Sequence, residues 1–455
     1  MSRAASGSPA AAQRNQDLAS AVHEAEENYV AANPESRRLA TRAAAHLPGG
    51  NTRTTVHFSP FPLYMTGGKG SRLTDVDGHT YVDFINEYTA GVFGHSNPVI
   101  AAAIHQALAG GINLGAPTQH ERMLAEEVQR RFPAMELLRF CNSGTEANLL
   151  ALATARASTG KEAVLIFDGA YHGSILYFAH GASPLNMKFE WITSTFNDLD
   201  RTRADIARHA TRLAAVLVEP MQGGAGALPA DPDFLRGLRA TCDEHKVLLI
   251  LDEVMTSRLD VGGVQRLFGV KPDLMSLGKY IGGGVTIGAF GGRADIMARF
   301  DPSRPDAFPH GGTFNNNTLA MMAGHAALTQ VLTEAAQTRM NRLGDSLRDR
   351  LNALARKHGM PMQATGLGSI FGIHFHEGEI RNAGDLDRAE HGREAAIGDL
   401  KKLFHLDMLA AGHYVSRRIL GNLSIETSQA DVDAFCAAVE EFLVSRGPVV
   451  QAAMA

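Results

Sequence analysis

The stretch "VLLILDEVMTSR", residues 247–258, contains five consecutive apolar residues and then two acids, Asp252 and Glu253. A short apolar run without polar alternation is typical of a strand that is buried on both faces. A capping box of Thr118 and Glu121 predicts a helix start before the first such run. The sequence therefore predicts an α/β fold with a mostly parallel central sheet covered by helices. The other predicted strands of this kind lie at 137–142, 163–168, 213–220 and 273–278.

The two ends of the chain predict a second, smaller α+β domain. Helical patterns occur near residues 17–32 and 35–45, and alternating residues around Asp77 and Gly78 predict a hairpin. Near the C-terminus, "MQATGLGSIFGIHF" predicts strands, followed by helices near residues 389–411 and 430–445. We therefore predict a disordered tail at 1–16, small-domain segments at 17–66 and 331–455, and a large domain at 67–330.

Composition restricts the classes of partner. The chain has 455 residues, 45% of them hydrophobic, and a formal net charge of −5 without a basic region, which argues against nucleic acid and anionic membranes. Its apolar runs are far shorter than the ~20 residues of a membrane helix. The three cysteines lie far apart without metal-ligand spacing, so we expect a reduced, cytoplasmic protein without a metal site. Small molecules are the expected substrates.

Polar residues follow several predicted strands, and the carboxyl ends of parallel strands share one edge of a sheet. In "LRFCNSGTEANLLAL", a strand is followed by a turn at Ser143 and Gly144 and by a helix that begins near Thr145. Backbone N–H groups and two hydroxyls would converge there on an anion such as a phosphate. The alternative is an ordinary helix cap that binds nothing.

Aromatic and acidic side chains follow the next strands. Tyr171 and His172 come after the strand at 163–168, where an aromatic face could stack on a planar ring. Glu219 ends another apolar run, and Asp252 ends the strand at 247–251. A carboxylate at the end of a buried strand needs a cationic partner or strong hydrogen bonds. Core packing, a loop acid and a helix cap are the alternative interpretations of these residues.

Lys279 lies in "SLGKYIGGG", between an apolar run and three glycines. A lysine at a bend between two buried strands is partly desolvated, and desolvation favours its neutral amine. A neutral amine is the form that attacks an aldehyde to give a Schiff base. An ordinary surface lysine is the alternative, which the apolar flanks of Lys279 disfavour.

Together these residues supply the parts of a pyridoxal 5′-phosphate site. The parts are a phosphate-binding turn, an aromatic plate, a carboxylate and a desolvated lysine. Asp252 would keep the pyridine nitrogen protonated, so that the ring can accept electrons when a carbon loses its proton. Lys279 would hold the cofactor and move the proton.

The motifs "NSGTEAN", "YHG", "VEPMQG", "LDEVMTSR", "SLGKYIGGG" and "GGTFNNN" resemble those of the class III (ω-)aminotransferases, which are fold type I pyridoxal phosphate enzymes. The resemblance implies a homodimer whose active sites lie at the subunit interface. It also implies that Lys279 is the Schiff base lysine and that Asp252 meets the pyridine nitrogen. Val254 would contact the ring opposite Tyr171, and Thr313 would reach the phosphate in the neighbouring subunit.

Within this family, "INEYTAGVFGHS", "DEVMTSR" and "GAFGGRADIMARFDP" resemble the bacterial aromatic β-amino acid aminotransferases. That resemblance implies that Arg53 binds the substrate carboxylate, for which an arginine offers a fork of two donors. A surface arginine is the alternative. In the late loop "YVSRRILGNLS", Arg418 matches the mobile arginine that accommodates the acceptor, but the loop departs from the family pattern and Arg417 could take this role.

The resemblance implies transfer of the amino group of an aromatic β-amino acid to 2-oxoglutarate or pyruvate, in a ping-pong cycle through pyridoxamine phosphate. The segments "LPGGNTRTT" and "GGINLG" are also similar to glutamate-1-semialdehyde aminomutases, although "NTRTT" replaces their usual "NSPVRA". An intramolecular aminomutase, a broad ω-amine transaminase and a racemase are therefore alternatives. A non-catalytic cofactor-binding protein would lack Lys279 or Asp252, and this chain has both.

Overall fold

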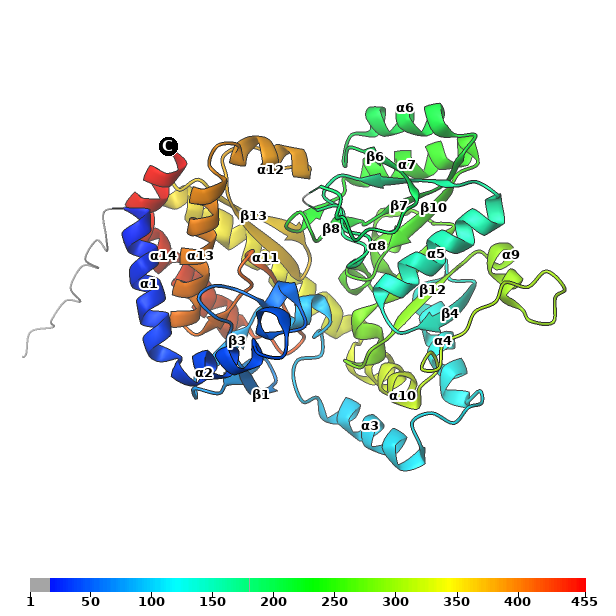
Figure 1. The fold of residues 1–455 in the computed structure, drawn as a ribbon, viewed down its shortest axis with the longest axis horizontal. Coiled ribbons are helices and arrows are strands. Elements are labelled where there is room, and N and C mark those ends of the chain that lie inside the picture. Colours follow the sequence, from blue (N-terminus) through cyan, green and yellow to red (C-terminus); the bar gives the residue numbers. More distant parts are fainter. Residues whose placement is uncertain (1–16, 180) are drawn as a thin grey trace, which may run out of the picture.

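The computed structural model describes residues 17–179 and 181–455, so the tail predicted at 1–16 lies outside the described residues. Its centre is a seven-stranded sheet, seen in the right half of Figure 1. Neighbouring strands are parallel except β12, which runs antiparallel to both β4 and β11. The predicted mostly parallel sheet is thereby confirmed. In spatial order the strands are β4 (Leu137–Cys141), β12 (Gly288–Gly292), β11 (Leu274–Gly278), β10 (Leu248–Asp252), β7 (Leu213–Val218), β5 (Ala163–Phe167) and β6 (Glu190–Ser194).

Helices cover both faces of this sheet, because its central strands are apolar on both sides. Along β5, Leu165 and Phe167 face one core and Val164 and Ile166 face the other. On the latter face, α5 packs against β7, β11 and β12. On the opposite face, α7 packs against β10. The large-domain helices are α3 (Pro98–Gly110), α4 (Gln119–Arg131), α5 (Gly144–Thr159), α6 (Leu199–His209), α7 (Pro232–His245), α8 (Gly263–Phe268), α9 (Ala294–Met297) and α10 (Thr318–Ala326).

The helix α4 occurs where it was predicted, but the predicted capping box is wrong. Thr118 is the N-cap residue and its side chain caps no N–H group. The Glu121 carboxylate instead accepts a hydrogen bond from the Asn316 side chain at 3.4 Å. The Glu121 carboxylate is therefore engaged in a tertiary contact instead of the local contact with the N-cap residue that a capping box requires.

The N- and C-terminal segments lie together on the other side of the molecule (Figure 1). There α1 packs against α13, and β3, at the edge of the sheet formed by β1 to β3, pairs with β15. The strands β1 to β3 thus join a strand of the C-terminal segment, and the domain boundaries at 66 and 330 stay a prediction. The elements are α1 (Leu18–Ala32), α2 (Pro34–Ala43), β1 (Met65–Lys69), β2 (Arg72–Asp75), β3 (Thr80–Asp83), α11 (Glu334–Lys357), β13 (Met362–Leu367), β14 (Ile370–Phe375), α12 (Ala383–Glu390), α13 (Glu394–Ala410), β15 (His413–Tyr414), β16 (Leu420–Asn422) and α14 (Gln429–Met454).

Two further strands, β8 (Met221–Gln222) and β9 (Leu228–Pro229), form a small hairpin after β7. Within residues 17–179 and 181–455, the helices are too short or too polar to cross a membrane.

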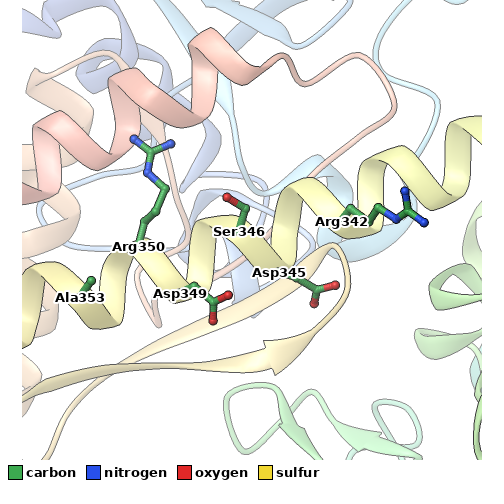
Figure 2. A pocket seen from close by; sticks show the side chains of 6 residues that line it. All are labelled: Arg342, Asp345, Ser346, Asp349, Arg350 and Ala353. Atoms are coloured by element: carbon green, nitrogen blue, oxygen red, sulfur yellow. The ribbon is translucent and has the colours of Figure 1, made fainter.

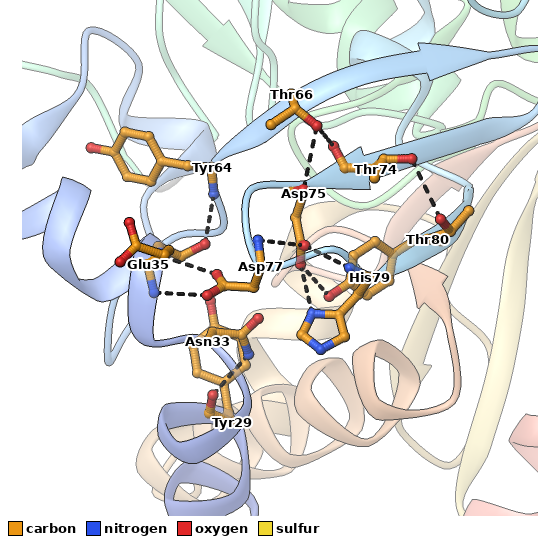
Figure 3. Close-up of polar contacts among 12 residues, drawn as sticks. Tyr29, Asn33, Glu35, Tyr64, Thr66, Thr74, Asp75, Asp77, His79 and Thr80 are labelled. Atoms are coloured by element: carbon orange, nitrogen blue, oxygen red, sulfur yellow. Dashed lines mark hydrogen bonds and ion pairs between the residues drawn. The ribbon is translucent and has the colours of Figure 1, made fainter.

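The turn of the β2–β3 hairpin holds the start of α2 (Figure 3). The N-cap residue Asn33 makes no side-chain cap, because its amide donates to the Tyr29 carbonyl instead. The carboxylate of Asp77 takes over and accepts hydrogen bonds from the N–H groups of Glu35 (2.7 Å) and Ser36 (3.0 Å). The hairpin therefore caps a helix that is distant in sequence.

We predict that Asp77→Ala destabilises α2 by about 1 kcal/mol, the usual cost of losing a helix cap. Partial burial opposes ionisation of Asp77, but hydrogen bonds from Ser36 and Glu35 outweigh it and lower the pKa. The stabilisation is therefore present above the pKa of the unfolded chain and is lost as the pH falls through the lowered pKa. Hydrogen exchange at residues 34–43 measures it, with Asp77→Asn as the control that keeps one acceptor. Unchanged exchange in Asp77→Ala would contradict the cap.

Candidate active site

Five strands of the central sheet end at the same edge, and each carries a polar residue there. The strands β4, β5, β7, β10 and β11 all run in one direction, and β12, which lies between β4 and β11, runs in the opposite direction. The structure thereby brings the predicted residues to one edge of the sheet. They are Ser143 after β4, Tyr171 after β5, Glu219 after β7, Asp252 at the end of β10 and Lys279 after β11.

Lys279 is partly buried and has a left-handed backbone conformation, with φ of 55°. A non-glycine residue pays about 1–2 kcal/mol for this conformation, so the surrounding structure must impose it. Burial lowers the pKa of the Lys279 amine to about 8, against the opposing charges of Asp252 and Glu219. The charges of Arg258 and Arg53 also lower it. The neutral fraction of this amine near physiological pH is therefore far larger than that of an ordinary lysine, although the protonated form still predominates.

Asp252 is buried and hydrogen-bonded through both oxygens. Its Oδ2 accepts hydrogen bonds from Nδ2 of Asn148 and from Nδ1 of His172, both at 2.7 Å. Its Oδ1 accepts from the N–H of Val254 at 3.1 Å and, more weakly, from Oγ of Ser276 at 3.4 Å. Because an ionised carboxylate only accepts, His172 carries its proton on Nδ1, and its buried Nε2 has no partner among the described residues.

Asn148 and Ser276 belong to the site, but sequence reasoning missed them. Asn148 also donates to the carbonyl of His172 at 3.0 Å, and its Oδ1 accepts from the Ser276 hydroxyl. These bonds fix the orientation of the Asp252 carboxylate and of the His172 ring. Asn148 follows Gly144 by one helical turn, so a buried polar residue at that spacing is the signal that could have found it.

The first turn of α5 presents free N–H groups. Oγ of Ser143 accepts a hydrogen bond from the N–H of Glu146 at 3.1 Å. The N–H groups of Ser143, Gly144 and Thr145 have no acceptor among the described residues, as expected where a helix begins. A Cβ at Gly144 would lie 2.7 Å from Cγ1 of Val254, so only glycine allows this close approach. The turn can bind an anion such as a phosphate beside Val254.

Tyr171 and Glu219 form one side of the site. The Glu219 carboxylate is buried and accepts hydrogen bonds from the N–H groups of Tyr171 (2.8 Å) and Gly223 (3.0 Å). Burial raises the pKa of Glu219 to about 7. The Tyr171 side chain is 42% exposed and meets the ring of Tyr177 edge-on at 5.7 Å between ring centroids. A large part of Tyr171 is therefore accessible to a ligand.

Arg53 and Arg418 lie near this side of the site. Burial raises the pKa of Tyr171, and the charges of Arg418 and Arg53 oppose that rise. The same two arginines oppose the raised pKa of Tyr88, which burial also causes. Burial lowers the pKa of His405, and the charge of the neighbouring Arg417 lowers it further. The charge of Arg418 thus acts on Tyr171 and Tyr88.

Thr313 is exposed, and no hydrogen bond joins its side chain to another described residue. Its loop is held near the anion-binding turn, because Nδ2 of Asn142 donates to Oδ1 of Asn315 at 2.9 Å. The contact expected of Thr313 with a neighbouring subunit stays a prediction.

A separate hollow runs along α11 (Figure 2). Two of its charged side chains are paired within the protein, Arg350 with Asp433 at 2.6 Å and Asp345 with Arg348. It contains no lysine or aromatic side chain, so cofactor chemistry belongs at the sheet edge. The hollow is lined by Arg342, Asp345, Ser346, Asp349, Arg350 and Ala353.

Known proteins are similar to this chain over most of its length. The model of the family "Aminotransferase class-III" matches residues 54–398. An uncharacterized aminotransferase of Schizosaccharomyces pombe is 44% identical over 438 residues, which are 96% of this chain and 98% of that protein. The beta-phenylalanine transaminase of Variovorax paradoxus is 44% identical over 430 residues, which are 94% and 97% of the two chains.

Solved structures are similar over almost the whole chain. The β-phenylalanine aminotransferase from Variovorax paradoxus superposes with a TM-score of 0.92, covering 95% of this chain and 99% of that one at 44% identity. A glutamate-1-semialdehyde aminomutase from Pseudomonas aeruginosa has a TM-score of 0.85 and covers 95% and 98% of the two chains, at 26% identity. The fold type is therefore that of the pyridoxal phosphate transferases predicted from the sequence.

We predict that the Lys279 amine titrates near pH 8, whereas an ordinary lysine has a pKa of ~10.4. Reductive methylation of the cofactor-free protein with formaldehyde, followed by peptide mass spectrometry, measures this titration residue by residue. In Asp252→Asn the midpoint should fall further, because a charge that favours the ammonium form is removed. A Lys279 profile that coincides with those of the exposed lysines would contradict the proposed desolvation.

Proposed function

The chain belongs to the class III aminotransferases, and we propose that it transfers the amino group of an aromatic β-amino acid to 2-oxoglutarate or pyruvate. The observation that carries the chemistry is a partly desolvated Lys279 amine one strand away from the buried Asp252 carboxylate. The 44% identity to a β-phenylalanine transaminase supports the substrate class. The 26% identity to an aminomutase gives weaker support for an isomerase.

Pyridoxal 5′-phosphate fits the residues at the sheet edge. We propose that its phosphate binds the free N–H groups and hydroxyls of Ser143, Gly144 and Thr145. Its ring would lie between Tyr171, which is exposed, and Val254, which packs against Gly144. The cofactor supplies an aldehyde carbon and a ring that accepts electrons.

Asp252 would face the ring nitrogen in this arrangement. The hydrogen bond that Oδ1 accepts from Ser276 is long, at 3.4 Å, so Oδ1 can accept another donor. The two short hydrogen bonds to Oδ2, from Asn148 and His172, keep the carboxylate oriented. Glu219 holds the backbone of Tyr171 and so positions the aromatic plate.

We propose that Nζ of Lys279 takes the proton from the carbon that bears the amino group and later returns a proton. A general base works best when its pKa lies near the working pH, and the Lys279 pKa of about 8 meets that condition. The same lysine would hold the cofactor at rest.

Two arginines would bind the carboxylates of the two substrates. Arg53 would grip the carboxylate of the β-amino acid with its forked guanidinium. Arg418, which is exposed and within electrostatic reach of Tyr171 and Tyr88, would serve the acceptor and make room for the aryl group. We assign the mobile role to Arg418 because its charge acts on Tyr171 and Tyr88, whereas the charge of Arg417 acts on the small-domain residue His405.

The proposal includes a homodimer in the cytoplasm. Exposed apolar side chains lie in the last turn of α3, on the loop that follows it and on the loop before α10. The N–H of Thr318, the first residue of α10, donates to the carbonyl of Ile112 at 3.0 Å and so holds these segments together. A second copy of the chain would cover this apolar surface, and Thr313 of the first copy would then reach the phosphate site of the second. The unpaired, buried cysteines support a reducing compartment. The exposed apolar side chains are Leu108, Ile112, Leu114 and Phe314.

We predict that Arg53→Ala raises the KM for β-phenylalanine by roughly 10- to 100-fold, the effect of about 1.5–3 kcal/mol in lost charged hydrogen bonds. The KM for 1-phenylethylamine, which has no carboxylate, should change little. Steady-state kinetics with both donors measures this contrast. The variant Arg53→Lys keeps the positive charge but loses the forked pair of donors, so its KM for β-phenylalanine should lie between those of the unsubstituted protein and Arg53→Ala. Equal losses with both donors would remove Arg53 from its assigned role.

A further inference from the structure

The guanidinium of Arg53 already has an anionic partner within the protein. Its Nη1 donates to Oε2 of Glu87 at 2.7 Å, and the two side chains are 45% and 62% exposed. An ion pair this exposed contributes only about 0–1 kcal/mol to stability. This ion pair therefore contributes little to the stability of the fold. The effect of Glu87 on the binding of a charged ligand at Arg53 depends instead on the position in which the Glu87 carboxylate is held.

Glu87 lies on a turn whose backbone is unusual. Four consecutive residues, Asn86 to Thr89, have positive φ angles between 40° and 80°. Each left-handed non-glycine residue costs about 1–2 kcal/mol, and such a turn persists only where its surroundings impose it. A side chain on this turn has a defined position even though its tip is exposed.

Buried hydrogen bonds impose the turn from three directions. Oδ1 of Asp83 accepts from the N–H groups of Ile85 (2.8 Å) and Asn86 (2.9 Å). The Asn86 side chain donates to the carbonyl of Asn422 at 2.7 Å. The fully buried Arg258 donates from Nη1 to the carbonyl of Thr89 at 3.2 Å. The turn is therefore fastened to the small domain and to the segment that follows Asp252.

A second contact fastens the segment of Arg53 to the same turn. The Tyr88 hydroxyl donates to the carbonyl of Thr55 at 2.6 Å, and the Arg53 guanidinium lies 5.7 Å from the centre of the Tyr88 ring. Within the described residues, Nε and Nη2 of Arg53 make no hydrogen bond. Arg53 thus has one edge on Glu87 and offers its other edge to a ligand.

We propose that Glu87 is a specificity-determining residue that weakens the binding of anionic ligands at Arg53 relative to the binding of neutral and cationic ones. This inference rests on the proposed function, in which Arg53 binds a substrate carboxylate. A carboxylate on the free edge of Arg53 lies within several ångströms of the Glu87 carboxylate and is repelled by it. A β-amino acid is a zwitterion, whereas a 2-oxo acid is an anion. Glu87 therefore weakens the binding of any substrate whose carboxylate lies on Arg53, and it weakens a net anion more than a zwitterion, whose ammonium group is attracted to Glu87.

The substitution Glu87→Gln tests this proposal, because it removes the charge and keeps an acceptor for Arg53. Isothermal calorimetry of the cofactor-loaded protein would compare three ligands with one phenylpropyl skeleton. These are the anion 3-phenylpropanoate, the neutral 3-phenylpropanamide and the cation N,N-dimethyl-3-phenylpropylamine. We expect the anion to bind about threefold tighter in the variant, the amide to be unchanged and the cation to bind about threefold weaker, as for one charge at several ångströms in an exposed site.

Two controls separate a charge effect from a structural one. Glu440→Gln removes the same charge from an ion-paired glutamate on α14 and should leave all three affinities unchanged. Raising the salt from 20 mM to 500 mM should shrink the difference between Glu87→Gln and the unsubstituted protein, because salt screens exposed charges. Equal shifts for all three ligands, or a difference insensitive to salt, would overturn the proposal.

Failure of the underlying function would give another result. If Arg53→Ala binds 3-phenylpropanoate as tightly as the unsubstituted protein, Arg53 does not bind carboxylates and the premise is wrong. If Arg53→Ala weakens that anion while Glu87→Gln leaves the anion-to-amide ratio unchanged, Arg53 keeps its role and only the inference about Glu87 is overturned.

Discussion

The desolvation of one lysine amine beside one buried carboxylate is the interaction on which the site depends. Burial lowers the Lys279 pKa to about 8, while Asp252 and Glu219 pull it upward. Had the two acids dominated, the amine would stay protonated and could not act as a nucleophile. Because β10 and β11 are parallel neighbours, with Asp252 paired to Ser276, the sheet itself places the carboxylate near the lysine.

One helix connects the two halves of this arrangement. The first turn of α5 presents the free N–H groups of Ser143 to Thr145, and one turn later Asn148 orients Asp252. The same rigid helix therefore positions both an anion bound at the turn and the Asp252 carboxylate that would meet a ring nitrogen. Such support is what holds reacting groups in a productive geometry.

The sequence was sufficient for most of the sheet and for several residues at its edge, because buried parallel strands have a distinct pattern and their ends converge by topology. It did not reveal β6, whose "EWITS" has few apolar residues, nor the antiparallel direction of β12, which no local pattern encodes. The capping box failed because Glu121 contacts Asn316, far away in the chain. Asn148 and Glu87 were missed for the same reason: their partners are distant in sequence.

The most direct test of the account is the first half of the proposed reaction. Racemic β-phenylalanine would be added to the purified, cofactor-loaded protein without an acceptor, and the absorbance spectrum recorded. The account predicts that the spectrum of the bound aldehyde form is replaced by that of pyridoxamine phosphate, and that 2-oxoglutarate or pyruvate restores it. An unchanged spectrum would contradict the proposed substrate class, and glutamate-1-semialdehyde and simple amines would then be the next substrates to examine.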